Sequence, residues 1–155
     1  MDVHPMEMTD YDEVMALWRD SEGIGLSDAD EPAAIARYLA RNPGLSFVAR
    51  EDGRLLGAVL CGHDGRRGFL HHLAVRPAAR GLGLGRVLVD RCLLALQAEG
   101  ITKCHLFVKR TNLPATLFWS RVGWQERVDL HMFSREEFGR VAEPSSDGRV
   151  SRRND

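Results

Sequence analysis

The N-terminal part of the chain begins with a weak alternation of apolar and polar residues and continues with a helical repeat. Residues 2–8 alternate as in a short strand. Thr9 and Asp12 have the spacing of a capping box, which predicts a helix that runs to about Asp20. The apolar residues of that helix recur at helical spacing and define one buried face: Val14, Leu17 and Trp18.

A second helix and a hairpin follow the polar stretch SEGIGLSDADE at residues 21–31. Pro32 suits the first turn of a helix, because the backbone N–H that proline lacks would have no partner there. The predicted apolar face of this helix is Ile35, Tyr38 and Leu39. The runs LSFVAR and LLGAVLCG then flank Asp52 and Gly53, a pair that accepts the positive φ angles of a tight turn. The sequence therefore predicts two antiparallel strands joined at this turn.

A strand, a loop and a helix follow the hairpin. The segment GFLHHLAV at residues 68–75 is a predicted strand, and a glycine-rich loop separates it from a helix predicted over residues 84–99. Gly100 ends this helix. Its expected buried face is Leu84, Leu88, Cys92 and Ala95.

Three more elements are predicted beyond Gly100. The run KCHLFV is a predicted strand, and Pro114 opens a short helix that ends near Gly123. QERVDLHMFS, at residues 125–134, is predicted to close the sheet as its last strand. The order β-α-α-β-β-β-α-β-α-β indicates an α+β fold with a mixed sheet.

Length and composition indicate one domain followed by a tail. A chain of 155 residues with 44% hydrophobic residues can close one core without disulfides or metal. We assign residues 1–138 to this domain. Residues 139–155 are polar and arginine-rich, which predicts a disordered tail; contact of the tail with nucleic acid or with an acidic substrate is the alternative.

Charge and cysteine content argue against several classes of partner. The formal net charge of −1 gives no global attraction for nucleic acid or an anionic membrane, and no apolar run approaches the ~20 residues that span a bilayer. The N-terminus lacks the basic and apolar regions of a signal peptide. Cys61, Cys92 and Cys104 lack metal-ligand spacing, so we expect buried free thiols in a cytoplasmic protein without a metal site. Redox or metal work is the alternative.

Three glycines spaced by two residues lie at the start of the predicted helix, in the run Arg80-Gly81-Leu82-Gly83-Leu84-Gly85-Arg86. A dinucleotide fingerprint fails, because Arg86 or Leu88 stands where its last glycine is needed. A nucleotide P-loop fails as well, because Arg86 and Val87 replace its lysine and hydroxyl residue. Free N–H groups at a helix start can still surround a pyrophosphate, and the two arginines add positive charge. The alternative is a structural connection with solvated arginines.

Two segments in the second half of the chain carry a family pattern. The first is Leu73-Ala74-Val75, followed by Arg76-Pro77-Ala78-Ala79 and by the R-x-x-G-x-G residues Arg80, Gly83 and Gly85. The second is Asn112, Ala115, Phe118 and Gly123-Trp124. Together they resemble the cofactor segments of the GNAT superfamily of N-acetyltransferases, and GHDGRRG resembles its small bacterial YpeA-type members. The resemblance implies a mixed, mostly antiparallel central sheet, flanked by helices and split between the fourth and fifth strands.

The resemblance also implies a binding site for acetyl-CoA as co-substrate. The CoA pyrophosphate would be held by Arg80, Gly81, Leu82, Gly83, Leu84, Gly85 and Arg86. The backbone of Leu73, Ala74 and Val75 would pair with the pantetheine arm, and an N–H near Val75 would face the thioester oxygen. Asn112 would contact the same arm, although it equally suits a helix N-cap. Phe118 and Trp119 would line the exit of the arm, although core packing is the commoner role of such residues.

An amine must lose a proton before it attacks a thioester, which costs ~4–5 kcal/mol at neutral pH for a pKa near ~10.4. The family often places a carboxylate on the fourth strand, where this chain has His71 and His72. Because side chains alternate along a strand, we expect only one of the two to face the cleft as the proton acceptor. The alternative is that one histidine packs and the other is solvated. His63 and Asp64 are further candidates, for binding a cationic substrate.

The sequence thus predicts an N-acetyltransferase in which a primary amine of a small molecule or peptide attacks acetyl-CoA directly in a ternary complex. Acidic residues within 21–31 suit an amine cation. Trp119 stands where the family usually carries a tyrosine that protonates the leaving thiolate, so the alternative is a catalytically weak acyl-CoA sensor. An adapter with a merely structural glycine loop is a third class. We expect a monomer or a homodimer without nucleic-acid or membrane partners.

Overall fold

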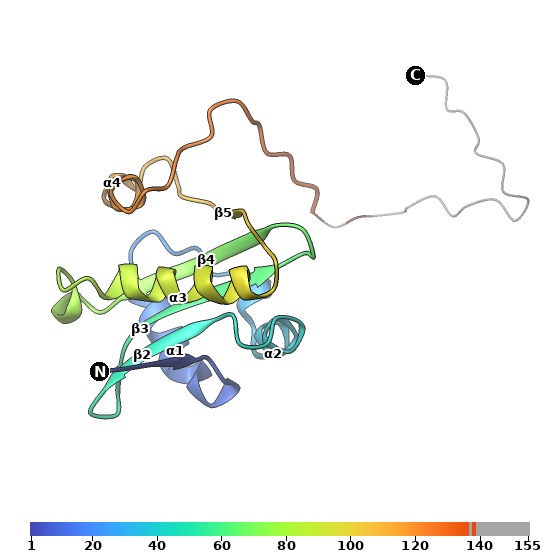
Figure 1. The fold of residues 1–155 in the computed structure, drawn as a ribbon. Helices are drawn as coiled ribbons and strands as arrows, with labels where there is room; N and C mark the ends of the chain where they lie inside the picture. Colours follow the sequence, from blue (N-terminus) through green and yellow to red (C-terminus); the bar gives the residue numbers. More distant parts are fainter. Residues whose placement is uncertain (137, 139–155) are drawn as a thin grey trace, which may run out of the picture. The chain divides into compact units, whose positions relative to one another are not determined.

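A five-stranded sheet forms the centre of the computed structural model, which describes residues 1–136 and Phe138 (Figure 1). The strands lie in the order β1-β2-β3-β4-β5, with bounds β1 (Asp2–Pro5), β2 (Phe47–Glu51), β3 (Arg54–His63), β4 (Gly68–Val75) and β5 (Cys104–Leu106). The first four pair antiparallel, whereas β5 runs parallel to β4. The predicted α+β class and mixed, mostly antiparallel sheet are confirmed.

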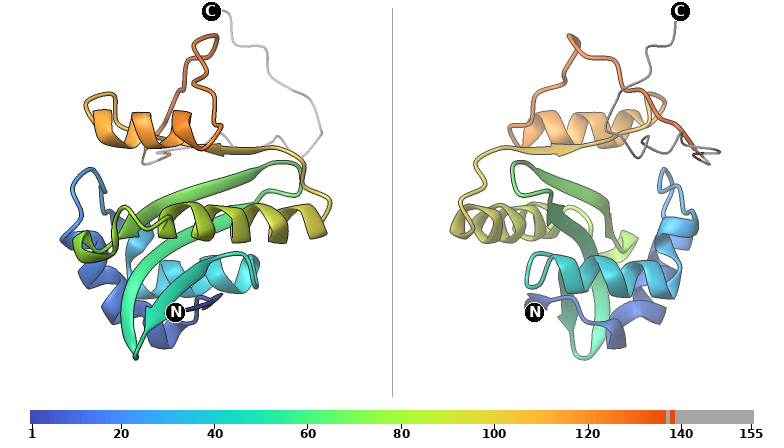
Figure 2. Two further views of the ribbon diagram at one scale, coloured as in Figure 1. Left: turned by 60° about the vertical axis from the view of Figure 1, so that its left-hand side comes forward. Right: turned by 90° about the vertical axis from the view of Figure 1, so that its right-hand side faces the viewer.

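Helices cover both faces of the sheet. Their bounds are α1 (Tyr11–Arg19), α2 (Pro32–Arg41), α3 (Leu84–Ala98) and α4 (Leu113–Arg121). Helices α1 and α2 pack on one face and α3 packs on the other, as the two views of Figure 2 show. Trp18 and Ile35 are buried in the first core, and Leu88 and Cys92 in the second. The predicted apolar faces of these three helices are confirmed.

The start of α1 differs from the prediction. The capping box consists of Glu7 and Asp10, in which the Glu7 backbone N–H donates to the Asp10 carboxylate at 2.9 Å. A short 3-10 turn at Met8–Asp10 then leads into α1. The predicted capping box of Thr9 and Asp12 is wrong; Asp10, which is buried, forms the box instead and also pairs with a half-buried residue of the sheet.

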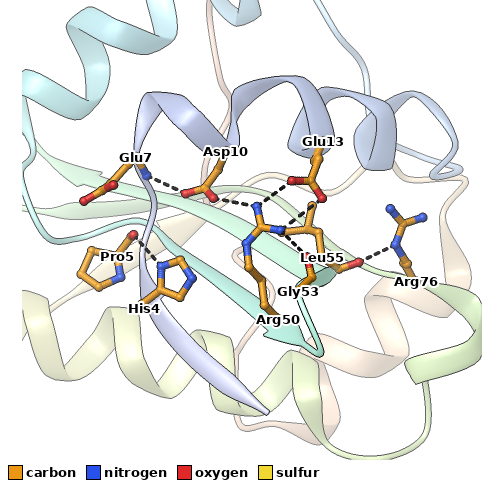
Figure 3. Close-up of polar contacts among 9 residues, drawn as sticks. All are labelled: His4, Pro5, Glu7, Asp10, Glu13, Arg50, Gly53, Leu55 and Arg76. Atoms are coloured by element: carbon orange, nitrogen blue, oxygen red, sulfur yellow. Dashed lines mark hydrogen bonds and ion pairs between the residues drawn. The ribbon is translucent and has the colours of Figure 1, made fainter.

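The residue that pairs with Asp10 is Arg50 of β2, which ties α1 to the sheet (Figure 3). Its guanidinium donates to Asp10 Oδ1 at 2.8 Å and to Glu13 Oε1 at 2.9 Å. Hydrogen bonds to Glu13 and Asp10 raise the pKa of Arg50 above its usual value. Because Asp10 is buried, the positive charge of Arg50 compensates a carboxylate that would otherwise lie unpaired in the interior.

The turn between β2 and β3 is the one predicted. Asp52 has a φ of 49° and Gly53 a φ of 76°, the pair of positive angles that a tight two-residue hairpin needs. Pro32 lies at the first turn of α2, again as predicted.

A β-bulge interrupts β4 at its two histidines. Leu60 of β3 lies opposite His71 and Ala58 lies opposite Ala74, so β4 holds one extra residue over this interval. His72 takes a left-handed φ of 55°, which histidine tolerates better than most side chains. The bulge cancels the alternation of side chains, and both imidazoles contact residues of the α1 and α2 face. The prediction that only one histidine faces the cleft is therefore wrong.

Strands β4 and β5 stay paired over a short distance. Residues 68–70 pair with residues 104–106, and no described residue pairs with the remainder of β4 on that side. Beyond β5 the chain moves away from β4, which the left view of Figure 2 shows. The predicted split between the fourth and fifth strands is confirmed, and it leaves backbone N–H and C=O groups of residues 71–75 on an open edge.

The predicted last strand is absent from the described residues. Residues 125–134 have no regular structure, and their side chains are exposed. Strand β5 has only three residues, so it offers few backbone groups to a further strand. The chain divides into two compact units after Trp124, and the site described below lies within the first, Met1–Trp124. The predicted tail at residues 139–155 lies outside the described residues.

The cysteines are free thiols, as predicted. Cys61 and Cys92 are buried and Cys104 is half-buried. A hydrogen bond with Cys61 and burial raise the pKa of Cys92, and burial raises the pKa of Cys104 to about 12. Thiols that stay protonated at neutral pH are poor nucleophiles. Within residues 1–136, no cluster of His, Cys, Asp or Glu could hold a metal ion, and no helix is long and apolar enough to cross a membrane.

Candidate active site

One cavity of about 890 Å³ brings together nearly all of the predicted site residues. Its walls come from β4, the glycine-rich loop, α4 and the loop between α1 and α2. The predicted residues on its wall are His71, His72, Leu73, Ala74, Val75, Arg80, Gly81, Gly83, Leu84, Gly85, Arg86, Asn112, Phe118 and Trp119. The exception is Leu82, which is 81% exposed and lines a second cavity of about 560 Å³.

The glycine-rich loop enters α3 through two left-handed residues. Gly81 has a φ of 78° and Gly83 a φ of 81°, angles that side chains with a Cβ rarely adopt. Gly83 is the N-cap of α3 and provides no side-chain hydrogen bond. The first N–H groups of this 15-residue helix therefore lack a capping side chain and lie at its positive end.

Gly85 has a different structural reason. It lies in the first turn of α3, and a Cβ there would come within 3.3 Å of Cζ of Phe118. The absence of a side chain lets α4 approach the start of α3. The third glycine of the motif therefore brings the two cofactor segments together.

Two arginines anchor the loop to the sheet. Arg76 donates from Nε to the carbonyl oxygen of Leu55 (Figure 3), and Arg80 donates from Nε to the carbonyl oxygen of Val75 at 3.0 Å. The Arg80 guanidinium is thus positioned by the strand that precedes the loop, and its two terminal nitrogens are left for other partners. Arg80 is exposed, so the alternative of a structural loop with solvated arginines stays open.

Asn112 is a helix N-cap, one of the two roles that the sequence left open, and it also lines the cavity. Its Oδ1 accepts a hydrogen bond from the Ala115 N–H at 3.2 Å, which makes it the N-cap of α4. Its Nδ2 lies against Gly23, so close that a Cβ on Gly23 would overlap it. The loop between α1 and α2 therefore meets the start of α4 at the cavity wall.

Phe118 and Trp119 both line the cavity and pack against neighbours. Their ring centroids are 5.0 Å apart at an interplanar angle of 75°. Trp119 also contacts Trp124 at 5.1 Å and packs against the core beneath α3. Core packing and cavity lining are therefore compatible roles for these half-buried rings.

The imidazoles of His71 and His72 are neighbours on the cavity wall. Their ring centroids are 6.4 Å apart. His71 stacks with Phe69 and Phe107 and meets Tyr38 of α2 edge-on. Burial, reinforced by the nearby His72, lowers the pKa of His71. The ring of His71 is therefore neutral at neutral pH.

His72 has a carboxylate partner. Its Nε2 lies 2.8 Å from Oδ1 of Asp30, which belongs to the 3-10 turn Asp28–Asp30 before α2. Asp30 is only 4% exposed. The ring of His72 also meets Trp18 of α1 edge-on, with centroids 5.0 Å apart. Residues from two other segments, α1 and the turn before α2, thus contact this imidazole.

Comparison with known proteins identifies the family. The model of the acetyltransferase (GNAT) family matches residues 11–124. An acetyltransferase of Pectobacterium atrosepticum is 33% identical over 112 residues, which are 72% of this chain and 79% of that protein. The chain belongs to the GNAT acetyltransferase family.

Solved structures agree with this GNAT fold. The aminoglycoside antibiotic 6'-N-acetyltransferase of Acinetobacter haemolyticus superimposes with a TM-score of 0.72 at 19% identity, over 88% of this chain and 99% of that one. A predicted acetyltransferase of Clostridium acetobutylicum, solved with acetyl-CoA, gives 0.67 at 18% identity over 86% and 95%. Membership of the GNAT family makes this chain an acetyl-CoA-dependent N-acetyltransferase.

Two residues predicted for this GNAT acetyltransferase lie away from the cavity. His63 Nδ1 accepts the Gly65 N–H at 3.0 Å. The carboxylate of Asp64 accepts the N–H groups of Arg67 and Arg66 at 2.8 Å, and these bonds lower the pKa of Asp64. Both side chains stabilise the turn between β3 and β4, and the structure does not bring them to the site.

Sequence reasoning missed two residues of the GNAT site, Asp30 and Gly23. The capping box of Ser27 and Asp30 is a local signal, but it indicates a helix start and nothing about catalysis. The partner of Asp30 is His72, 42 residues further along the chain. The contact of Gly23 with Asn112 joins residues still further apart in the sequence. No pattern of neighbouring residues could have revealed either contact.

Proposed function

We propose that the protein transfers the acetyl group of acetyl-CoA to a primary amine within this cavity, and that the amine attacks the thioester directly in a ternary complex. The observation that carries the proposal is that a single cavity is lined by the glycine-rich loop and by both His71 and His72. Direct attack requires the amine, the thioester and a proton acceptor in one space, and this arrangement provides it.

The residues of the loop fit the phosphates of CoA. A Cβ on Gly81 or Gly83 would meet no atom within 4 Å, so the space in front of these backbone groups is open. The uncapped N–H groups of α3, together with Arg80 and Arg86, suit a pyrophosphate. The open edge of β4 at residues 71–75 suits the amides of the pantetheine arm, which would add like a strand. The bound thioester supplies the acetyl group.

The histidine pair would remove the proton from the attacking amine. The lowered pKa of His71 keeps its ring free to accept a proton at neutral pH, and His72 lies beside it. A backbone N–H near Val75 would stabilise the negative charge that develops on the thioester oxygen, and one such donor is worth ~10²- to 10³-fold in kcat.

The leaving thiolate would depart without the usual tyrosine. Trp119 lines the cavity at the corresponding position, and its indole N–H can donate a hydrogen bond but cannot deliver a proton. A thiol with a pKa near ~8.5 leaves tolerably as a thiolate that is solvated by this N–H or by water. We therefore propose an active enzyme.

The acceptor would be a cationic amine of a small molecule or peptide. Asp20 and Glu22 line the cavity on the side of the loop between α1 and α2, whereas Arg80 and Arg86 line the side of α3. Opposite charges at the two sides favour an amine cation at one and the CoA phosphates at the other. Lys109 and Arg121 also line the wall and add positive charge there.

Incubation of the full chain with acetyl-CoA and a panel of amines tests the proposal, with release of CoA and the mass of the product as readouts. We expect acetylated amine from the wild type, a large loss in the double variant His71→Ala/His72→Ala, and unchanged activity in the control His63→Ala. Tight binding of acetyl-CoA without transfer to any amine would establish the sensor, which the tryptophan at position 119 favours. The absence of any thermal shift on addition of CoA would point to the adapter.

A further inference from the structure

Asp30 is the one fully buried residue of the loop between α1 and α2, and both oxygens of its carboxylate have a polar partner. Oδ2 accepts the backbone N–H of Ser27 at 3.0 Å, and Oδ1 lies 2.8 Å from Nε2 of His72. The carbonyl oxygen of Asp30 accepts the hydroxyl of Tyr11 at 2.7 Å. The hydrogen bonds to Ser27 and Tyr11 therefore hold Asp30 in place independently of its contact with the imidazole.

The geometry around His72 determines which ring nitrogen can accept a proton. An ionised carboxylate only accepts hydrogen bonds, so Nε2 of His72 must carry its proton toward Asp30. In the neutral ring, the other nitrogen, Nδ1, then keeps its lone pair. The side chain of His72 is 19% exposed and lines the active-site cavity, so a reacting group can reach it.

His71 lacks such a partner. Its contacts are the rings of Tyr38, Phe69, Phe107 and His72, and no described residue forms a hydrogen bond that would fix its tautomer. The titratable groups that face His72 are Asp30 from the loop and His71 from its own strand. Trp18, the neighbour on α1, does not titrate.

We infer that Asp30 is a positioning residue that holds His72 with its proton on Nε2, so that Nδ1 accepts the proton of the attacking amine. This inference rests on the proposed function. In the step, the ammonium group passes one proton to Nδ1, and its nitrogen then bonds to the acetyl carbon. The C–S bond breaks with its electron pair leaving on the CoA sulfur, and the second proton lost by the nitrogen passes to that thiolate or to water. The imidazolium that forms lies against the Asp30 carboxylate, which stabilises it.

Asp30→Asn is designed to reverse the tautomer of His72 while it preserves the fold. The single amide oxygen must face the Ser27 N–H, because an amide N–H₂ there would oppose another donor. The N–H₂ group then faces Nε2 of His72, which must become an acceptor and transfer its proton to Nδ1. The matched control is Asp28→Asn, which removes an exposed carboxylate from the same turn.

The first readout is the imidazole tautomer, measured by long-range ¹H–¹⁵N correlation in ¹⁵N-labelled full-length protein, with His72 assigned from His72→Gln. We expect the Nε2–H tautomer in the wild type and in Asp28→Asn, and the Nδ1–H tautomer in Asp30→Asn. This spectrum requires neither acetyl-CoA nor activity. A wild-type His72 with its proton on Nδ1 would overturn the inference, even if Asp30→Asn does not fold.

The second readout separates catalysis from structure. At neutral pH we expect Asp30→Asn to lose ~10²- to 10⁴-fold in kcat, the range of general base catalysis, with the KM for acetyl-CoA nearly unchanged. The loss should lessen as the pH approaches the pKa of the amine, and the same change should have little further effect in a His72→Ala background. A structural role would instead give an additive loss without pH dependence, and a loss no larger than that of Asp28→Asn would also overturn the inference.

The outcomes distinguish this inference from the function on which it rests. If the wild type acetylates no amine, the proposed function fails, while the tautomer spectrum still reports on the pair of Asp30 and His72. If the wild type is active but His72 carries its proton on Nδ1, or the loss in Asp30→Asn is additive and independent of pH, the inference fails and the proposed function remains.

Discussion

The two sides of the active-site cavity are built in opposite ways. On the cofactor side, the loop from Arg80 to Arg86 is one continuous stretch whose own glycines set its left-handed angles and its entry into α3. On the histidine side, His72 takes its partners from α1 and from the turn before α2, and its orientation depends on a bulge formed with β3. The proposed anion site is thus encoded by adjacent residues, whereas the proposed proton acceptor gains its surroundings only once the chain has folded.

The largest effect should come from the local side. Gly83→Glu places a carboxylate where the pyrophosphate would bind, and we expect the affinity for acetyl-CoA to fall by ~10²-fold or more, because charge-assisted hydrogen bonds are worth ~1.5–3 kcal/mol each. Calorimetry measures this affinity. Gly100→Glu is the matched control, since Gly100 has nearly the same φ of 82° and open space, but lies at the other end of α3. Equal losses in both variants would mean that backbone strain, not charge, is responsible.

Gly23→Ala tests whether the contact between the loop after α1 and Asn112 affects the binding of acetyl-CoA. The new Cβ would overlap Nδ2 of Asn112, so we expect the side chain to be displaced and the affinity for acetyl-CoA to fall by ~10-fold, the effect of ~1–2 kcal/mol of overpacking. Gly44→Ala is the matched control, because Gly44 has a similar left-handed φ of 75° and a Cβ there would meet no atom within 4 Å. That control should bind as the wild type does. Indistinguishable affinities in both variants would show that the contact with Asn112 has no role in binding.

Substitutions of Trp119 test how the thiolate leaves on the cofactor side, and we expect a smaller effect on turnover from them. Trp119→Tyr restores a hydroxyl that can protonate the thiolate. We expect turnover to stay unchanged or to rise by no more than ~10²-fold, the lower end of the range for general acid catalysis. Trp119→Phe keeps the packing against Trp124 and should change turnover only slightly. Steady-state rates measure both. A wild type without activity that gains it in Trp119→Tyr would support the sensor.

The smallest effect concerns stability on the histidine side. Burial lowers the pKa of His71 in the folded state, so the unfolded chain binds the proton more readily. The contribution of His71 to stability is therefore fully present above its ordinary pKa near ~6.5 and is lost as the pH falls through that value. We expect His71→Gln to reduce the slope of stability against pH by less than ~1.4 kcal/mol per pH unit, the limit for one proton. Urea denaturation at pH 5 to 8 tests this, and an unchanged slope would contradict it.

The same difference between the two sides explains which parts of the fold and of the site could be predicted from the sequence. The loop residues, the hairpin turn and the helical faces follow from adjacent residues, and the structure places all but Leu82 of the cofactor residues on one cavity wall. Strict alternation along β4 failed because a bulge depends on the register with β3, which the strand does not encode by itself. The expected strand at residues 125–134 failed because alternation shows that a segment can pair, not that a partner is long enough.

The pH dependence of kcat/KM for the wild type, His71→Ala and His72→Ala, with His63→Ala as control, tests the central claim most directly. We expect kcat/KM at neutral pH to fall markedly in His72→Ala, the variant that lacks the proposed proton acceptor. The loss should narrow as the pH rises toward the pKa of the amine near ~10.4, because free amine then needs no base. The control should follow the wild type throughout. If both active-site variants keep the wild-type profile, neither histidine accepts the proton, and the account is contradicted.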